Sequence, residues 1–373
     1  MRITFLLPSL AGGGAEYAQI RLANRLAKEG GNEVKIMAIG KERRLEYSVS
    51  KDVVVQRCKK ERAAIAFMDI RKGLMKKNTD YFVSSLTHLN IASMLAWLTL
   101  GRARRCKIIL SERNHLASSL ESMPWLKRSI YRFLVRRLYG YADCLYAVSD
   151  QAAWSVRVVS GYPARSIYNG YESKEGIRNI QEERTKSDNA FRVVMVGRLE
   201  EHKGILEAVK AIRVLKDRYG GSEERVIELH IYGIGPLASR VIEENQDLIR
   251  DKRLVLMGFD KDIQQKIRDY DLLVLASKRE GLPGVVVEAL RSDIAIVSTM
   301  CPSGPVEILE GGRYGILIPS NSPAMIASAI ITVVRNRWLC LYDRKRTRDR
   351  FTIGAAKAGF DRMIHDIESS DRR

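Results

Sequence analysis

The sequence predicts an α/β protein made of two doubly wound domains, and three observations support this prediction. The length of 373 residues suits two domains, with one large barrel as the competing count. Short runs rich in Val, Ile and Leu alternate with longer segments of helical period, which is typical of a parallel sheet wrapped by helices. The alternation stops at the polar stretch 172–189, which indicates an interdomain linker.

The first domain is predicted over residues 1–180. Its buried strands are expected at 3–7, 34–39, 81–84, 107–110 and 144–148, and its amphipathic helices at 15–28, 65–77 and 125–139. Pro8 and the glycines after it indicate that the first strand runs into a loop, which argues against a signal peptide. The apolar run 91–100 is too short to span a bilayer, which takes about 20 helical residues.

The second domain is predicted over residues 181–350. Its strands are expected at 192–196, 226–232, 254–257, 272–275 and 294–298, and its helices at 205–219, 236–249, 283–291 and 323–337. Residues 351–373 are expected to form a helix that packs back toward the first domain. Ligands of such folds bind at the carboxyl ends of the strands, so a cleft between the domains is the expected site.

The composition narrows the function classes. With 46% apolar and 29% charged residues, disorder, collagen and disulfide scaffolds are excluded as the dominant character. The net charge of +19 indicates an anionic partner: nucleic acid, membrane lipid or a phosphorylated substrate. Residues 1–185 hold +15 of that charge, so the excess belongs to the first domain. Five scattered cysteines without C-x-x-C spacing favour reduced thiols in a cytosolic protein.

Glycine-containing loops follow the predicted strands of the second domain. In GRLEEHKG at 197–204, Gly197 lets a ligand approach the backbone, while Arg198 and Lys203 add two cations beside a helix start. Together these residues could cradle a diphosphate. The alternative is a tight turn with two solvated surface cations.

A second loop, GIGPL at 233–237, also lies between a strand and a helix. Gly233 and Gly235 could admit a ligand against the backbone. Pro236 is well suited to a first helical position, which favours a structural role for this loop taken alone.

The third loop, SKREGLPGVVVEAL at 277–290, is the most informative. Glu280 lies at a strand end and Glu288 on the following helix, with the turn 281–284 between them, so both carboxylates are expected near one cleft. Among its apolar neighbours Glu288 needs hydroxyl or N–H partners, and a ribose would supply two hydroxyls. The alternative is a capped helix with one exposed glutamate.

Two further segments follow predicted strands. STMCPSGPVEIL at 298–309 leads into another helix start marked by proline and glycine. SLAGGGAE at 9–16 follows the first strand, but Tyr17 occupies the third glycine position of G-x-G-x-x-G and no G-K-[ST] follows. A dinucleotide fingerprint and a P-loop are therefore both unsupported.

The ordered segments GRLEEHKG, GIGPL, SKREGLPGVVVEAL and CPSGPVEIL resemble the donor-binding half of the retaining glycosyltransferases of family four. GGGAE and SERNH fit the acceptor half of that family, so the resemblance covers nearly the whole chain. It implies the GT-B fold, in which two Rossmann-like domains face each other across a cleft. The CPSGP stretch is similar to the subgroup that builds bacterial surface polysaccharides, whose usual donors are UDP-sugars.

The resemblance implies roles for the matching charged residues. Arg198 and Lys203 would hold the donor diphosphate and stabilise the leaving group. Glu288 would bind the ribose hydroxyls, and Glu280 would face the transferred sugar. Preorganised positive charge at a developing anion is usually the largest catalytic contribution.

The backbone would contribute as well. Gly284 and Val285 would give N–H groups to the phosphate or sugar, and Gly13 and Gly14 would approach the donor from the opposite domain. The residues implied in donor binding are Gly13, Gly14, Gly197, Arg198, Lys203, Gly233, Gly235, Pro236, Glu280, Gly281, Leu282, Pro283, Gly284, Val285 and Glu288.

The family also places a polar residue, often histidine, beside the donor sugar. That histidine aligns with Arg113, Asn114 or His115 of this sequence, and we assign it to His115. A loop histidine that is merely solvated is the structural alternative. The implied catalytic residues are Glu280, Arg198, Lys203 and His115.

The implied reaction moves a hexosyl or N-acetylhexosaminyl unit from a UDP-sugar to a hydroxyl of a lipid-linked saccharide, in the synthesis of O-antigen, capsule or exopolysaccharide. No carboxylate is obviously placed as a covalent nucleophile, so the resemblance implies a front-face substitution, assisted by the leaving phosphate, that retains the anomeric configuration. The D-x-D tripeptides at 260–262 and 269–271 are interpreted as a helix cap and a strand start, so no metal and no cofactor is predicted.

Two other functions remain as alternatives. A sugar-nucleotide epimerase or hydrolase would keep the same fold. A non-catalytic, nucleic-acid-binding first domain is less favoured, because its basic residues are spread over several helices without interleaved aromatics, and no nucleic-acid partner is predicted.

The segment 125–139 bears on location. It has five basic residues and an apolar stripe at Leu126, Ile130, Phe133, Leu134 and Leu138, so it could lie in an anionic leaflet. We expect instead, by a small margin, that the stripe packs on the sheet. The predicted location is cytoplasmic and peripheral on the inner face of the cell membrane.

Overall fold

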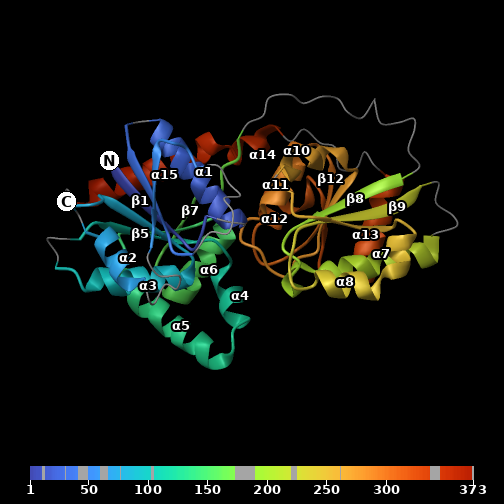
Figure 1. Ribbon diagram of the computed structural model, residues 1–373, viewed down its shortest axis with the longest axis horizontal. Helices are drawn as coiled ribbons and strands as arrows, with labels where there is room; N and C mark the ends of the chain where they lie inside the picture. Colours follow the sequence, from blue (N-terminus) through green and yellow to red (C-terminus); the bar gives the residue numbers. More distant parts are fainter. Residues whose placement is uncertain are drawn as a thin grey trace. The chain divides into compact units, whose positions relative to one another are not determined.

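The protein is described here from a computed structural model (Figure 1). The described residues are 1–10, 13–29, 31–40, 49–58, 66–75, 77–101, 105–172, 190–219, 225–260, 262–336 and 345–371. Gly12, Lys261, Cys340 and most of the predicted linker 172–189 lie outside these ranges.

The chain divides into two compact units. Unit 1 consists of Met1–Ser173 and Asp349–Arg373, and unit 2 is Lys174–Arg348. The sequence analysis placed these boundaries at 180 and 350. Unit 2 is therefore an insertion between two segments of unit 1.

Unit 1 contains a seven-stranded parallel sheet in the order β3-β2-β1-β4-β5-β6-β7. Its strands are β1 (Arg2–Leu7), β2 (Glu33–Ala38), β3 (Val53–Arg57), β4 (Tyr81–Ser85), β5 (Lys107–Glu112), β6 (Cys144–Ala147) and β7 (Arg165–Ser166). The strand order reverses between β1 and β4, which makes the carboxyl ends of these two strands the switch point of the sheet.

Helices cover both faces of this sheet, because strands buried on both sides need apolar partners on both sides. The helices of unit 1 are α1 (Gly14–Lys28), α2 (Phe67–Gly73), α3 (Thr87–Leu98), α4 (Leu116–Glu121), α5 (Trp125–Leu138), α6 (Asp150–Ser160) and α15 (Ile353–Asp371), with α14 (Lys345–Arg350) at the boundary between the units. Phe5 on β1 packs with Ile20 and Leu26 of α1 and with Phe360 of α15, whose ring centroid lies 5.9 Å from that of Phe5. The C-terminal helix thus completes the same apolar face as the first helix (Figure 1).

Unit 2 repeats this plan with six parallel strands in the order β10-β9-β8-β11-β12-β13. Its strands are β8 (Ala190–Val196), β9 (Val226–Tyr232), β10 (Leu254–Gly258), β11 (Leu272–Leu275), β12 (Ala295–Thr299) and β13 (Ile316–Ile318). The switch point lies between β8 and β11, so ligands are expected at the loops that leave these two strands.

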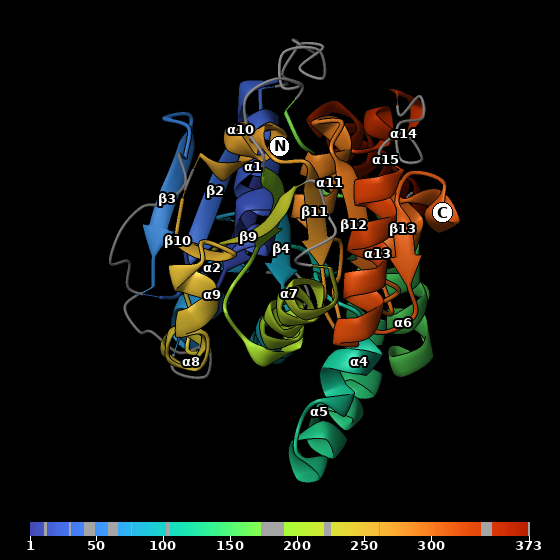
Figure 2. The same cartoon turned by 90° about the vertical axis from the view of Figure 1, so that its right-hand side faces the viewer.

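The helices of unit 2 are α7 (Ile205–Tyr219), α8 (Ala238–Glu244), α9 (Gln246–Arg250), α10 (Ile263–Lys266), α11 (Gly284–Arg291), α12 (Pro305–Ile308) and α13 (Pro323–Arg335). Figure 2 shows α7 and α13 side by side across one face of the sheet, where Ile212 and Ile330 join the core formed with Val193 and Val274. The apolar stripe of each helix therefore faces the strands.

The doubly wound α/β prediction is confirmed for both sheets, but three strands were not predicted. These are β3, β7 and β13, which lie at the sheet edges. Four of the five residues of β3 are exposed, and β7 and β13 have two and three residues. Short or exposed edge strands lack the continuous apolar run by which a buried strand is found in sequence.

Candidate functional site

The loops that leave β8 and β11 meet at the switch point of unit 2. The first loop contains Gly197, Arg198 and Lys203, and the second contains Glu280. Lys203 Nζ donates to Glu280 Oε1 over 2.7 Å, with side-chain exposures of 22% and 10%. The backbone N–H of Lys278 also donates to the carbonyl of His202, over 2.8 Å. The structure therefore brings together two of the predicted catalytic residues.

Glycines make this close approach of the loops possible. Gly204 has a φ of 68°, and a Cβ there would lie 2.1 Å from the carbonyl oxygen of Ala276. Gly233 has a φ of 139°, and its Cβ would lie 1.8 Å from the carbonyl oxygen of Gly197. Both positions combine a backbone conformation that disfavours side chains with a lack of space, so only glycine fits them.

Gly197 and Gly235 differ in the space that a side chain would have at each position. A Cβ on Gly235 would lie 2.5 Å from the carbonyl oxygen of Leu199, so this glycine is required by packing. A Cβ on Gly197 would find Lys203 Cδ as its nearest neighbour at 3.8 Å, an ordinary contact. The packing of the described residues therefore does not require glycine at 197, which leaves its donor-binding role as a prediction.

Arg198 is more accessible than Lys203. Its side chain is 70% exposed and lies 2.6 Å from Glu200 Oε1. The other oxygen of Glu200 lies 3.3 Å from His202 Nδ1, and burial, together with the charge of Lys203, lowers the pKa of His202. The loop carries two cations and two glutamates, and the exposed guanidinium can reach a ligand without disturbing the Lys203 ion pair.

The loop after β9 is joined to the loop after β8 through its backbone. The N–H of Leu199 donates to the carbonyl of Ile234 over 3.0 Å, and the N–H of Leu237 donates to the carbonyl of Leu199 over 3.1 Å. Ile234 and Pro236 are exposed at the surface of this loop. Gly233, Gly235 and Pro236 thus lie beside the loop that carries Arg198.

The helix α11 begins next to Glu280. Gly281, Leu282 and Pro283 are buried, while Gly284 and Val285 form the half-buried first turn. The first N–H groups of a helix have no acceptor within the helix, so this turn can offer donors to an anion. Glu288 lies half-buried in the second turn.

His115 lies in unit 1 and has a structural role there. It is the N-cap of α4: its Nδ1 accepts the Ser118 N–H over 3.3 Å and lies 2.8 Å from Ser118 Oγ. Burial lowers the pKa of His115, which favours the neutral ring that an accepting Nδ1 requires. The catalytic role of His115 stays a prediction.

Arg113, two residues earlier, was not among the predicted site residues. Its side chain is buried, with 7% exposure, and it donates to Asn169 Oδ1. Its Nε has no partner among the described residues.

Gly13 and Gly14 begin α1 in unit 1. A Cβ on Gly13 would lie 1.9 Å from Glu16 Oε2, so the Glu16 carboxylate folds back over the start of its own helix. That arrangement compensates the positive end of the helix dipole. An approaching diphosphate would meet this carboxylate, a feature that the GGGAE pattern did not predict.

Both D-x-D tripeptides are engaged by protein groups. Asp260 accepts the Asp262 N–H over 2.8 Å and pairs with Lys266 over 2.6 Å. Asp271 accepts the Arg192 N–H over 2.8 Å, at the start of β11. Within the described ranges no three His, Cys, Asp or Glu side chains gather in a way that could hold a metal ion.

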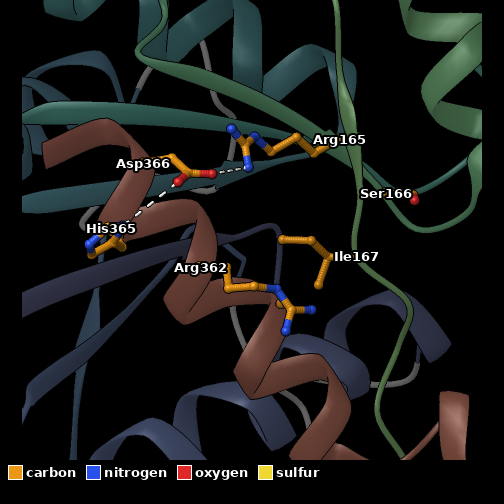
Figure 3. A pocket seen from close by; sticks show the side chains of 7 residues that line it. Arg165, Ser166, Ile167, Arg362, His365 and Asp366 are labelled. Atoms are coloured by element: carbon orange, nitrogen blue, oxygen red, sulfur yellow. Dashed lines mark hydrogen bonds and ion pairs between the residues drawn. The ribbon is translucent and has the colours of Figure 1, made fainter. Parts of the chain in front are cut away.

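A small cavity of about 250 Å³ lies in unit 1 between β7 and α15 (Figure 3). Arg165 pairs there with Asp366, and Arg362 and His365 extend from α15 toward the same opening. None of the predicted site residues lines it. Gly359 lies against Ile167 beside this cavity, so these residues belong to the seam that holds α15 on the sheet.

Comparisons with known proteins cover both units. Residues 190–336 match the family described as Glycosyl transferases group 1, and residues 12–175 match the family described as Glycosyltransferase Family 4.

Two curated relatives illustrate the range of similarity. The GalNAc-alpha-(1->4)-GalNAc-alpha-(1->3)-diNAcBac-PP-undecaprenol alpha-1,4-N-acetyl-D-galactosaminyltransferase of Campylobacter jejuni is 24% identical over 395 residues, which span 99% of this chain and 100% of the relative. The putative colanic acid biosynthesis glycosyltransferase WcaL of Salmonella typhimurium is 26% identical over 204 residues, 52% of this chain and 48% of the relative.

Solved structures share the fold along almost the full chain. Anabaena HepE in complex with UDP and glucose has a TM-score of 0.77 at 17% identity, covering 98% of this chain and 99% of that one. Sucrose-phosphate synthase from Thermosynechococcus elongatus has a TM-score of 0.79 at 14% identity, covering 99% of both chains.

Proposed function

The chain belongs to the group 1 and family 4 glycosyltransferases of the GT-B fold, and from this premise we propose that it moves a hexosyl or N-acetylhexosaminyl unit from a UDP-sugar to a hydroxyl of a lipid-linked saccharide. The transfer retains the anomeric configuration and serves the synthesis of a bacterial surface polysaccharide.

The observation that carries this proposal is the Lys203–Glu280 pair at the switch point of unit 2. A nucleoside diphosphate leaving group develops negative charge, and an ammonium group fixed beside it lowers the energy of the transition state. Glu280 holds Lys203 in place and presents its second oxygen to sugar hydroxyls. Arg198 and the first turn of α11 supply further positive charge and N–H donors.

The test of this site is Lys203→Ala, with Lys210→Ala as its matched control. Lys210 is exposed on α7, so the control removes the same charge away from the loop. We expect Lys203→Ala to lower kcat by about 100-fold or more and the control to keep wild-type kcat. The assay follows sugar transfer to an undecaprenyl-linked saccharide, with circular dichroism as the check on folding.

Full activity of a folded Lys203→Ala protein would overturn the donor site. Isomerised UDP-sugar formed without acceptor would favour an epimerase instead, and free sugar alone would favour a hydrolase. Proton NMR of the product reports the anomeric configuration. An inverted anomeric carbon would contradict the proposed retention of configuration.

Metal independence is part of the proposal. It rests on the cations of the loop after β8 and on the pairing of Asp260 with Lys266. We expect kcat in excess EDTA to stay within twofold of its value in added Mg²⁺ or Mn²⁺. A loss of activity in EDTA that only a divalent cation restores would contradict it.

The lipid-linked acceptor is supported by the Campylobacter relative, which covers the chain end to end and acts on an undecaprenol-linked glycan by its name. Unit 1 agrees with this acceptor in charge, because residues 1–185 carry a net charge of +15. A polyprenyl diphosphate or an anionic leaflet complements such a surface.

The helix α5 supports a peripheral membrane location. Leu126, Ile130 and Phe133 have exposures between 50% and 59%, so the expectation that the stripe packs on the sheet was wrong for these three residues. Trp125, at the start of the helix, is 71% exposed. Leu138 does face the interior. Figure 1 shows α5 at the outer end of unit 1, farther from the sheet than α3, and Figure 2 shows it projecting beyond α4.

Cations flank this exposed apolar face. Arg137 lies over the Phe133 ring, with its guanidinium carbon 5.5 Å from the centroid, and Lys127 lies over Tyr131. An amphipathic helix of this type lies in the interface plane of an anionic bilayer. Among the described helices, none is long and apolar enough to cross one.

Co-sedimentation with vesicles tests this location. We expect binding to vesicles with 30% anionic lipid, and at least tenfold weaker binding of an Ile130→Asp, Phe133→Asp double variant. Lys210→Glu on α7 is the control. Equal binding to neutral and anionic vesicles would show that the basic residues do not contribute to membrane binding. Unchanged binding of the double variant would show that α5 is not the docking face.

A further inference from the structure

The CPSGP segment at 301–305 follows β12 and has no role in the function proposed above. The structure places it directly against the loop that carries Glu280. Thr299 Oγ1 donates to the carbonyl oxygen of Ser277 over 2.6 Å, and Ser303 Oγ donates to the carbonyl oxygen of Gly281 over 2.7 Å. One hydroxyl therefore binds the chain three residues before Glu280 and the other binds it one residue after.

These two hydrogen bonds are shielded from water. Thr299 and Ser303 are 4% and 0% exposed, and Ser277 is 1% exposed. A buried carbonyl that loses such a donor cannot turn to solvent instead, which makes the loss of either hydroxyl costly. The loop 276–280 lies outside the helices and strands, so these hydroxyls help to fix its path, together with the hydrogen bond from the Lys278 N–H to the His202 carbonyl.

The packing beside these bonds is equally close. Gly304 has a φ of 91°, and a Cβ there would lie 2.4 Å from Pro283 Cδ and 2.9 Å from the Gly281 carbonyl oxygen. Cys301 lies near enough to the ion pair that Glu280 raises the pKa of its thiol and Lys203 lowers it, after the larger effect of burial. The segment 299–304 is thus the layer of protein beneath the Lys203–Glu280 pair.

We propose that Thr299 and Ser303 are positioning residues for Glu280: they hold the backbone on both sides of it and so aim its carboxylate at the transferred sugar. The inference rests on the proposed function of Glu280. A displacement of about 1 Å of a group that contacts the substrate can lower the rate about 100-fold. Thr299 and Ser303 can therefore affect kcat through the position of Glu280, without contacting the substrate themselves.

A double-mutant cycle tests this proposal. Its four proteins are wild type, Ser303→Ala, Glu280→Gln and the double variant, and the measured quantity is kcat for sugar transfer. We expect Ser303→Ala to lower kcat about tenfold in the wild-type background and less than twofold in the Glu280→Gln background, because its effect passes through Glu280. An equal loss in both backgrounds would overturn the proposal.

A second pair of variants separates positioning from general damage to the fold. Thr299→Val keeps the shape but removes the hydroxyl, whereas Thr299→Ser keeps the hydroxyl. We expect Thr299→Val to lower kcat while its affinity for UDP stays unchanged. We expect the kcat of Thr299→Ser to lie within threefold of the wild-type value. Equal activity of the Val and Ser variants would count against positioning, as would losses of UDP affinity and kcat by the same factor.

Ser298→Ala is the matched control. Ser298 is buried on the same strand, and its hydroxyl donates to the carbonyl of Thr299, not to the Glu280 loop. We expect it to keep wild-type kcat, and a tenfold loss there would contradict the assignment to Thr299 and Ser303. If Glu280→Gln itself retained full activity, the proposed role of Glu280 would fail first, which distinguishes the two failures.

Discussion

At the scale of single residues, buried polar groups at strand ends are the features that sequence patterns describe least well. Glu112 at the end of β5 is an example. Its carboxylate accepts hydrogen bonds from Thr87 Oγ1 at 2.9 Å, from Asn90 Nδ2 at 3.1 Å and from the Tyr139 hydroxyl. Three elements of unit 1 are joined through this side chain.

Burial raises the pKa of Glu112 to about 7 from an ordinary 4.5, and the three hydrogen bonds oppose this shift. The folded state therefore holds a proton more tightly than the unfolded state. The protonated Glu112 therefore stabilises the folded state fully below pH 4.5, and this stabilisation is lost as the pH rises through 7. The free energy of unfolding falls by about 3 kcal/mol over this pH range because of Glu112 alone.

We therefore expect Glu112→Gln to flatten the pH dependence of stability. The neutral amide cannot titrate, so the free energy of unfolding should fall less between pH 4.5 and 7 than in the wild type. Urea unfolding at several pH values measures this. A slope identical to that of the wild type would mean that Glu112 does not titrate in this range.

Gly233 leads to a second prediction at this scale. Its φ of 139° and the 1.8 Å approach of a Cβ to the Gly197 carbonyl leave no room for a side chain. Gly233→Ala should lower the free energy of unfolding by about 2 kcal/mol or more and weaken UDP binding, because the loop after β8 must move.

Gly101→Ala is the control for this variant, since a Cβ at Gly101 meets nothing within 4 Å. Thermal unfolding and calorimetric titration with UDP measure the two effects. A Gly233→Ala protein with wild-type stability would show that the loop adapts without cost.

At the scale of elements, the central strands were predictable, whereas of the four edge strands only β10 was predicted. The strands next to the switch points have continuous buried apolar runs, and their predicted bounds differ from the observed ones by a few residues at most. The predicted helix 236–249 is instead interrupted at Asn245, whose side-chain amide donates to the Val241 carbonyl over 3.0 Å. An asparagine that caps a helix within an otherwise helical period is a local effect that periodicity does not reveal.

The docking of α15 gives a prediction at this scale. Phe360 is fully buried against Phe5 and the helix α1. Phe360→Ala should lower the free energy of unfolding of unit 1 by about 3 to 5 kcal/mol, because the cavity left behind adds to the lost burial.

Ser369→Ala, at an exposed position of the same helix, is the control and should change stability by less than about 0.5 kcal/mol. Guanidinium unfolding followed by circular dichroism measures both. A loss below 1 kcal/mol for Phe360→Ala would show that α15 contributes little to the core of unit 1.

At the scale of the whole molecule, the sequence predicted two α/β domains and placed Lys203 and Glu280 in loops at strand ends, because both follow from the alternation of strands and helices. The ion pair between Lys203 and Glu280 is a finding of the structure. The supporting residues could not be predicted in the same way. The hydroxyls of Thr299 and Ser303 contact a loop that is distant in sequence. Glu16 folds back over Gly13 because of its side-chain rotamer. Such contacts and rotamers produce no periodicity or spacing pattern in the sequence.

The division into units predicts the effect of a truncation. Removal of residues 349–373 takes α15 from unit 1 and exposes the part of the core that α15 covers beside α1, whereas unit 2 keeps its core and the Arg348–Asp293 pair. Hydrogen exchange should then show lost protection in β1 and β2 and retained protection in β8 and β9. Unchanged protection in β1 would contradict the role of α15.

The insertion of unit 2 within unit 1 also sets an order of events during synthesis. The ribosome makes the seven strands of unit 1, then the 175 residues of unit 2, and only afterwards α15. At usual elongation rates, the apolar surface around Phe5 stays without its last helix for about 9 to 35 s. During that interval unit 2 can fold first, while the nascent first unit still exposes the apolar surface that α15 will cover.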